Sequence, residues 1–157
     1  ESTSQWQRRD YKSFGSNEGA NPEWAKAKSI QEMPVTSAIT AIQNASQDRS
    51  GSTQEPDRPI IVEGYAYSGG GREIIRVDIS VDEGKTWDQA ELLDDRVKGS
   101  KAWCWKRWRY HGLKRCDGKT TVLVKATDDA YNTQPESYES IYNARGNLAH
   151  AWHRVTV

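Results

Sequence analysis

The chain has 157 residues with 22 basic and 22 acidic side chains, so it carries no formal net charge at neutral pH. This balance excludes a strong electrostatic field for nucleic acid or for an anionic membrane, and no apolar run approaches the ~18 residues that a membrane span needs. A chain of this length can bury roughly 70% of the surface of its unfolded state, so we expect one domain with extensions that folds without disulfide or metal support.

The N-terminal segment has no sustained helical or strand period up to Pro22. Residues 6–12 read WQRRDYK and combine three bases with two aromatic side chains. They form either a solvated tail that Trp6 anchors to the body or the lining of an anion pocket, because guanidinium groups provide planar, permanent positive charge. Asn21 and Pro22 suit the N-cap and first position of a helix, so one or two helical turns are expected over residues 21–28.

The stretch from Gly64 to Trp87 predicts a twisted β-hairpin with a buried aromatic side chain at its base. Residues 61–68 and 74–81 both alternate polar and apolar side chains, which is typical of half-buried strands. Glycines separate the two runs. In the second run, the isoleucine and valine residues at odd-numbered positions are expected to face one side together. A glycine in the turn 82–85 supplies the positive φ of a tight hairpin, after which the chain returns.

Further strands are expected at residues 35–42, 101–110, 120–127 and 152–157, with a return strand ending at 92 and a polar loop at 44–59. About seven short strands with turn-rich connections and almost no helix predict an antiparallel β-sandwich.

Residues 101–110 read KAWCWKRWRY, and four bases lie among their aromatic side chains. Such a pattern can bind single-stranded nucleic acid by stacking and charge. It also suits a core strand whose lysine and arginine side chains reach solvent or pair with Asp94 and Asp95. The neutral chain favours the core strand, so we expect no nucleic-acid partner.

The cysteines and histidines identify no site. Cys104 and Cys116 are too few for a disulfide scaffold or a zinc site. One disulfide is the alternative to the interpretation that we favour, two free buried thiols. His150 and His153 are three residues apart, which on an extended strand places them on opposite faces, so no metal site is expected.

Two other polar groups also identify no reaction. Asp128 and Asp129 would diverge as neighbours on an extended chain, so they are interpreted as turn acids. Residues 69–72 (GGGR) could form an anion nest, but no helix follows them to add a dipole. The residues alone therefore predict a β-sandwich with an arginine-rich edge and no identified chemistry.

Five segments, taken in order, resemble the C-terminal part of eukaryotic sulfite oxidases, within the molybdenum-cofactor oxidoreductase family. They are residues 6–12, 29–39, 64–87, 125–135, and 142–146 with 151–155. The resemblance implies an immunoglobulin-like dimerisation domain at residues 33–157. Residues 1–32 would be the terminal segment of a molybdenum domain and a linker. The chain begins with Glu1 rather than methionine, so we expect it to be part of a longer polypeptide.

The same resemblance implies an enzyme that oxidises sulfite to sulfate at a molybdenum–molybdopterin cofactor and passes the electrons through a b-type haem to cytochrome c. Both cofactors are expected to be bound mainly by regions absent from this chain, which alone should be inactive. The implied partners are a second copy, through the β-sandwich, and the molybdenum domain of the same polypeptide, with neither nucleic acid nor membrane. The implied compartment is the mitochondrial intermembrane space.

The resemblance also implies site residues. Tyr11 matches the tyrosine of the family's RRDY segment, which hydrogen-bonds at the molybdenum site, and this gives it a catalytic and substrate-binding role. Arg145 matches the substrate-binding arginine of the family's N-x-R-G segment, and its fork of donors suits the small dianion sulfite. Gly146, Arg8 and Arg9 are expected to be structural residues near the pocket, with Gly146 allowing close backbone approach.

Two alternatives stay open. One is the equivalent domain of a eukaryotic nitrate reductase, which shares the molybdenum and sandwich domains, although the segment WQRRDYK favours sulfite oxidase. The other is a non-catalytic immunoglobulin-like interaction module.

Overall fold

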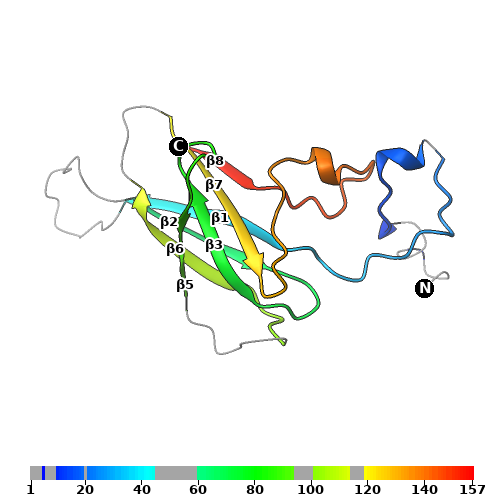
Figure 1. Ribbon diagram of the computed structural model, residues 1–157, viewed down its shortest axis with the longest axis horizontal. Helices are drawn as coiled ribbons and strands as arrows, with labels where there is room; N and C mark the ends of the chain where they lie inside the picture. Colours follow the sequence, from blue (N-terminus) through cyan, green and yellow to red (C-terminus); the bar gives the residue numbers. More distant parts are fainter. Residues whose placement is uncertain (1–4, 6–9, 20, 45–59, 94–100, 114–118) are drawn as a thin grey trace, which may run out of the picture.

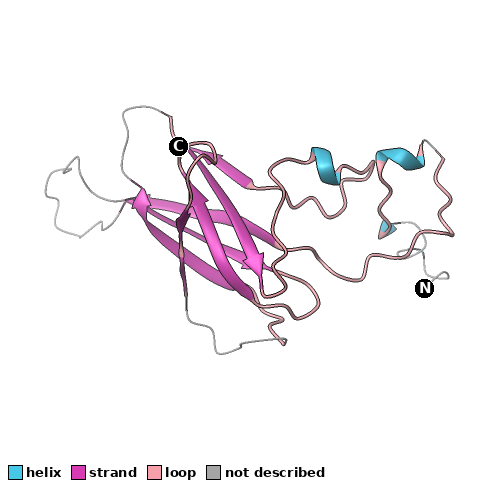
Figure 2. Cartoon of the chain, viewed as in Figure 1, coloured by secondary structure: helices cyan, strands magenta, loops and turns pink. Residues whose placement is uncertain are grey.

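The computed structural model describes residue 5 and residues 10–19, 21–44, 60–93, 101–113 and 119–157. It consists of a β-sandwich and an irregular N-terminal segment, and the connection between the last two strands extends from the sandwich to that segment (Figure 1). Figure 2 shows that the strands gather in the sandwich, while the short helical turns lie beside it in the N-terminal segment and in the connection between the last two strands. Within the described residues, no helix has the length and apolar character needed to cross a membrane.

The described residues contain eight strands: β1 (Thr36–Asn44), β2 (Ile60–Tyr67), β3 (Ile74–Ser80), β4 (Asp88–Gln89), β5 (Glu91–Leu92), β6 (Lys106–Leu113), β7 (Thr121–Asp128) and β8 (His153–Thr156). One sheet has the order β1-β2-β6-β5 and the other β4-β3-β7-β8, and every pairing is antiparallel. The first order is that of strands A, B, E and D of immunoglobulin domains, and β3, β7 and β8 correspond to C, F and G. The predicted all-β, immunoglobulin-like sandwich is confirmed, with an additional strand because the return strand divides into β4 and β5.

The core lies between the sheets and is centred on Trp108 of β6, which is fully buried. Trp108 pairs across the sheet with Gly64 of β2. A Cβ atom at Gly64 would collide with the indole ring, so the glycine provides the space that the tryptophan fills. Because successive strand residues face opposite sides, alternate positions of both sheets complete this core: Val62, Ala66, Val77, Ile79, Val122, Val124 and Ala126.

The hairpin predicted around the turn 82–85 forms, but the burial predicted for the aromatic side chain at its base is wrong. Residues 61–68 and 74–81 do not pair with each other, because β2 and β3 lie in different sheets. The glycine-rich turn between them carries the chain across the sandwich, and the hairpin consists of β3 and β4. Its turn contains Gly84 with a φ of 86°, as expected. Trp87, which was expected to be buried, is half-buried and packs edge-on against Trp152 with ring centroids 4.8 Å apart.

A β-bulge changes the side-chain phase at the start of β3. The register with β7 shifts after Ile74, so Ile74 is 4% exposed while Ile75 is 40% exposed. The predicted common face is therefore wrong at both ends, because Val77 and Ile79 are buried but Ile75 and Val81 are exposed. An inserted residue reverses the alternation locally, and Val81 already belongs to the turn.

Strand β6 begins at Lys106 rather than at residue 101. Residues 101–105 precede its first pairing with β2. Trp103 is 63% exposed, whereas the Trp105 ring stacks on Tyr65 of β2 with ring centroids 4.4 Å apart. Cys104 is exposed too, which makes the prediction of a buried thiol wrong at that position. Cys116 lies outside the described residues.

The strand interpretation of this stretch is nevertheless correct, since β6 contributes to the core. Two of its basic side chains form ion pairs: Arg109 Nη2 lies 2.6 Å from Glu63 Oε1 of β2, and Lys106 Nζ lies 3.8 Å from Glu73 Oε1. The partners expected from the sequence, Asp94–Asp95, lie outside the described residues.

The helix expected at residues 21–28 does not form. These residues make a single turn, in which the Lys26 N–H donates to the Glu23 carbonyl at 3.0 Å. So short a segment forms a helix only with a packed apolar face, and its large side chain, Trp24, packs instead on Phe14 with ring centroids 4.8 Å apart. Two 3-10 turns are described, η2 (Ser16–Glu18) and η3 (Glu139–Ile141).

Candidate functional site

The connection between β7 and β8 carries Arg145 away from the sandwich, and Gln134 closes its base. The Gln134 amide nitrogen donates to the carbonyls of His150 and Ala151 at 3.0 and 3.1 Å. Its Oε1 accepts hydrogen bonds from Ser37 of β1 at 2.6 Å and from a backbone N–H of β7 at 3.0 Å. Gln134 is 2% exposed, so these bonds are shielded from water and fix the loop base to both sheets.

Asp128, at the end of β7, fixes the start of the same connection. It holds a turn as predicted, but it is fully buried. Its carboxylate accepts hydrogen bonds from Ser68 Oγ at 2.8 Å, the N–H groups of Ala130 and Asn132 at 3.0 and 2.9 Å, and Asn132 Nδ2 at 2.9 Å. Burial raises the pKa of Asp128, but the bonds from Asn132 and Ser68 outweigh it and hold the pKa below its ordinary 3.8.

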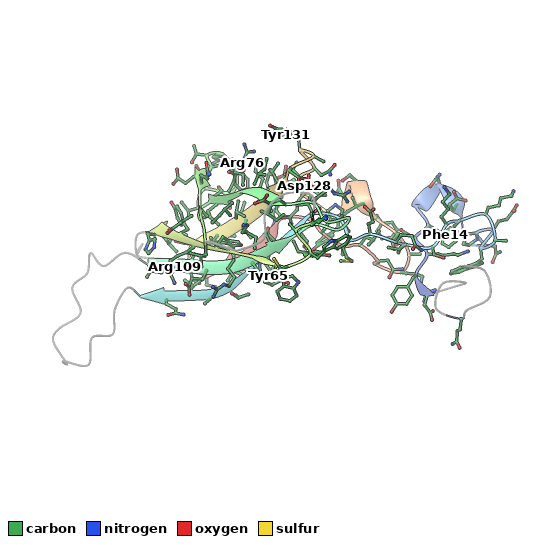
Figure 3. The ribbon with its side chains drawn as sticks, turned by 90° about the horizontal axis from the view of Figure 1, so that it is seen from below. Phe14, Tyr65, Arg76, Arg109, Asp128 and Tyr131 are labelled. Atoms are coloured by element: carbon green, nitrogen blue, oxygen red, sulfur yellow. The ribbon has the colours of Figure 1, made fainter. Side chains whose placement is uncertain are left out.

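The glycine-rich turn between β2 and β3 completes the cluster around this carboxylate. Arg72 Nε lies 3.3 Å from Asp128 Oδ2, and Arg72 Nη2 donates to Glu32 Oε2 at 2.7 Å. The bond to Glu32 raises the pKa of Arg72 against the opposing effect of burial. The arginine therefore joins β7 to the segment that leads into β1. Figure 3 shows Asp128 at the base of the turn that bears Tyr131, on the side of the sandwich towards the N-terminal segment.

Asn143 shapes the loop that carries Arg145. Its Oδ1 accepts hydrogen bonds from the N–H groups of Asn147 and Arg145 at 3.0 and 3.3 Å, and its Nδ2 donates to the Asn147 carbonyl at 2.6 Å. Asn143 is 8% exposed, so a buried amide closes the turn. Gly146 has a φ of 68°, which L side chains rarely adopt. A Cβ atom there would meet no described atom within 4 Å, so the glycine serves the backbone conformation.

The loop meets the N-terminal segment through polar contacts. Arg145 Nη2 lies 2.8 Å from Asp10 Oδ1. Asn147 Nδ2 donates to the carbonyls of Asp10 and Lys12 at 3.2 and 3.0 Å. We name this contact between residues 10–12 and residues 143–147 the polar junction. In Figure 1, the loop that follows η3 reaches the N-terminal segment, drawn in blue, beyond the end of the sandwich.

Trp24 and Lys12 extend the polar junction. Lys12 is 4% exposed, and its Nζ donates to the Trp24 carbonyl at 2.6 Å. The Arg145 guanidinium lies 5.7 Å from the centroid of the Trp24 ring, within the range of a cation–π contact. The Tyr11 carbonyl accepts a hydrogen bond from the Ile30 N–H at 2.6 Å. The backbone around Tyr11 is thus fixed by several independent bonds.

The structure brings the segments of Tyr11 and Arg145 together, although Asp10 and Arg145 are 135 positions apart. Tyr11 is 51% exposed and the Arg145 side chain 38% exposed, so both belong to the surface of the polar junction. Arg8 and Arg9 lie outside the described residues. The roles of these four residues and of Gly146 in a substrate pocket stay predictions.

Sequence reasoning missed the amide side chains that build this site. Asn132 follows Asp128 by four positions within a turn sequence, and this spacing is a signal for the side-chain-capped turn that forms there. Asn143 before a glycine turn is a weaker signal of the same kind. Asn147 has no local signal, because its partners lie 137 and 135 positions away.

Neither the histidines nor the cleft described in the N-terminal segment provides a second candidate site. No group of three or more His, Cys, Asp or Glu side chains there could hold a metal ion, and His153 Nδ1 instead accepts a hydrogen bond from the Ile39 N–H at 3.1 Å. A cleft of about 410 Å³ in the N-terminal segment is lined by the acidic residues Glu18 and Glu23 and by the basic residue Lys26. Two carboxylates disfavour a dianion in that cleft, unlike the arginine of the polar junction.

The chain is similar to known proteins in sequence and in structure. A family model described as Mo-co oxidoreductase dimerisation domain matches residues 27–157. Mitochondrial sulfite oxidase of Rattus norvegicus is 45% identical over 159 residues, which cover 100% of this chain and 28% of that protein. Nitrate reductase [NADH] 1 of Phaseolus vulgaris is 37% identical over 167 residues, which cover 99% of this chain and 18% of that protein.

Among solved structures, the crystal structure of the sulfane dehydrogenase SoxCD from Paracoccus pantotrophus matches with a TM-score of 0.66 and 23% identity, covering 98% of this chain and 36% of that chain. This likeness shows the fold alone. The match to the rat relative covers the whole of this chain but only 28% of the length of that relative.

Proposed function

The chain belongs to the family of Mo-co oxidoreductase dimerisation domains, and from this premise we propose that it is the C-terminal part of a sulfite oxidase. The full enzyme converts sulfite to sulfate in a two-electron oxidation, and this part supplies substrate-pocket residues and the contact between two copies. The observation that carries the proposal is the polar junction, which joins the segments of Tyr11 and Arg145 at one surface. The identity of 45% to the rat sulfite oxidase supports the same substrate.

Arg145 binds the substrate anion in this proposal. Its guanidinium is oriented by the bond of 2.8 Å to Asp10 and by its position over Trp24, and a guanidinium fork fits the oxygens of sulfite. The Tyr11 phenol donates a hydrogen bond to a substrate oxygen without adding charge. The partly exposed side chains of both residues suit a pocket completed by another part of the polypeptide.

The donor set of the polar junction fits an oxyanion beside a cofactor, rather than the ligands of a metal, because an arginine and a phenol bind oxygens but do not hold molybdenum. We therefore assign the molybdenum–molybdopterin cofactor and the b-type haem mainly to other regions of the protein. When bound, the molybdenum cofactor supplies the two-electron chemistry.

The division of the chain and its partners follow from the same proposal. Residues 33–157 are the dimerisation domain and form a homodimer through the sandwich, whereas residues 1–32 are the last segment of the molybdenum domain and a linker. The electron acceptor of the full enzyme is cytochrome c. The rat relative is named as mitochondrial, which supports a mitochondrial enzyme, and we place it in the intermembrane space.

Replacing Arg145 by Gln in the full-length protein tests the site. The loss of one charged partner of a bound anion costs roughly 2–5 kcal/mol, so the KM for sulfite should rise by more than tenfold while thermal unfolding of the sandwich stays unchanged. Arg107→Gln is the matched control, because that arginine is exposed on β6 and should leave the KM unchanged. An unchanged KM in Arg145→Gln would contradict the assignment.

The nitrate reductase alternative is supported by the 37% identity to the bean enzyme. Steady-state assays of the full-length protein with sulfite and with nitrate decide between them, and nitrate reduction without sulfite oxidation would reject our proposal. A native protein without molybdenum would favour the non-catalytic module. Sedimentation of the full-length protein should show a dimer at micromolar concentration, and a monomer there would reject the proposed contact.

A further inference from the structure

We propose that Asn147 is a positioning residue for Tyr11, because its side-chain amide fixes the backbone on both sides of the tyrosine. The inference deepens the proposed function and rests on it, since it concerns how the sulfite site is held together. It assigns to the asparagine a task beyond closing its own loop.

The geometry of the amide carries the proposal. Asn147 Nδ2 donates to the carbonyl of Asp10 at 3.2 Å and to the carbonyl of Lys12 at 3.0 Å. These are the residues on either side of Tyr11, and the Tyr11 carbonyl itself is bonded to the Ile30 N–H at 2.6 Å. The three successive carbonyls from Asp10 to Lys12 therefore each accept a hydrogen bond. Asn147 donates two of these three bonds. A rotation of the backbone at Tyr11 would break at least one of these bonds.

Asn147 is itself held in place, so it can serve as a reference point. Its backbone N–H donates to Asn143 Oδ1 at 3.0 Å, and its carbonyl accepts from Asn143 Nδ2 at 2.6 Å. The same Oδ1 accepts from the Arg145 N–H at 3.3 Å. One buried asparagine therefore fixes the backbone at both Arg145 and Asn147.

The two contacts across the polar junction then have different tasks. The pair between Arg145 and Asp10 sets the direction of the guanidinium, whereas the amide of Asn147 sets the distance and angle of the Tyr11 segment relative to that loop. An amide is suited to this task, because it carries two N–H donors on one nitrogen and has no charge that would compete with Arg145 for an anion. The half-buried position of Asn147 reduces competition from water.

The test is a double-mutant cycle in the full-length protein with sulfite. Asn147→Ala should lower kcat/KM roughly 10- to 100-fold, the size expected when a reacting group is displaced by about 1 Å. Tyr11→Phe should lower it too, and the double variant should be no worse than Tyr11→Phe alone, because Asn147 acts through the tyrosine. Asn147→Gln keeps both donors and should restore most of the activity. Asn17→Ala, an exposed asparagine of the same N-terminal segment, is the control.

A second measurement does not depend on catalysis. Backbone amide hydrogen exchange of the full-length protein should become faster over residues 10–12 in Asn147→Ala but not in Asn17→Ala. Losses that add in the double variant, or unchanged exchange over residues 10–12, would overturn the role of Asn147. If the full-length protein does not oxidise sulfite, or if Arg145→Gln and Tyr11→Phe leave sulfite oxidation unchanged, the proposed function fails, and the exchange measurement still decides whether the amide holds the segment.

Discussion

The β-sandwich and the polar junction are stabilised by different interactions. The sandwich buries apolar side chains between two sheets, with Trp108, Val62 and Val77 at 0% exposure. The polar junction instead joins partly exposed segments through amide-to-carbonyl bonds and the pair between Arg145 and Asp10. Burial of one large apolar side chain contributes about 1.5–3 kcal/mol, whereas an exposed ion pair contributes about 0–1 kcal/mol. Most of the stability therefore comes from the sandwich. The polar junction fixes geometry and contributes little to the free energy of unfolding.

The largest expected effect tests the sandwich. Trp108→Ala removes the side chain at the centre of the core and should lower the free energy of unfolding by about 3–5 kcal/mol, measured by urea denaturation. Its indole Nε1 has no hydrogen-bond partner among the described residues, so Trp108→Phe should cost clearly less than Trp108→Ala. Trp103→Ala is the control, because that tryptophan is 63% exposed, and it should change stability by less than about 0.5 kcal/mol. Equal losses of unfolding free energy in Trp108→Ala and Trp103→Ala would contradict the conclusion that the buried core provides the stability.

The next effect concerns Asp128, which lies between the two regions. Asp128→Asn removes the charge that faces Arg72 in a buried cluster and should cost about 3 kcal/mol. The neighbouring Asp129→Asn alters an exposed side chain and should cost less than about 0.5 kcal/mol. Urea denaturation measures both. A small loss in Asp128→Asn would show that the polar groups at the end of the sandwich contribute to geometry alone, as those of the polar junction do.

The pH dependence of stability should report the same carboxylate. Because the folded-state pKa of Asp128 is lower than its ordinary 3.8, its ionised form stabilises the fold above that ordinary value. This contribution is lost as the pH falls below it towards the folded-state pKa. Denaturation from neutral pH to about pH 3 should therefore show a steeper loss in the wild-type chain than in Asp128→Asn. Parallel curves would exclude Asp128 as a source of the acid sensitivity.

The sandwich could be predicted from the sequence further than the site could. Period-two patterns located most strands, because each reflects burial on one face of a local segment. The bulge after Ile74 was missed, since an inserted residue is set by the partner strand and not by the local period. The role of Arg145 was predicted from a family resemblance. The roles of Asn147 and Gln134 were not predicted, because their side chains bond to backbone groups elsewhere in the chain. An amide that contacts carbonyls elsewhere in the chain has no signature in its own neighbourhood.

A smaller effect separates backbone geometry in the polar junction from stability. Gly146→Ala places a side chain at a φ of 68°, which costs roughly 1–2 kcal/mol for an L-residue. The loop can relieve this strain by rearranging, so the KM for sulfite of the full-length protein should rise while unfolding of the sandwich stays unchanged. Gly19→Ala is a matched control, since Gly19 also has a φ of 68° and no described atom within 4 Å of a Cβ, but it lies outside the polar junction. Similar changes in KM for both variants would contradict the role of the loop geometry.

The smallest effect lies at a polar turn of the sandwich that is remote from the polar junction. Hydrogen bonds, first from the Thr86 hydroxyl at 2.6 Å, then from the Thr86 N–H and the Ser80 hydroxyl, lower the pKa of Asp82 to about 2. Thr86→Val keeps the shape of the side chain but removes the first bond, so the pKa should rise towards the ordinary 3.8. Titration of the carboxyl carbon by NMR measures it, with Thr121→Val as a control on the β7–β8 pair. An unchanged pKa would assign the shift to the backbone of the turn. We expect the pKa to rise without any change in the KM for sulfite, which would show that polar contacts in the sandwich and in the polar junction act independently.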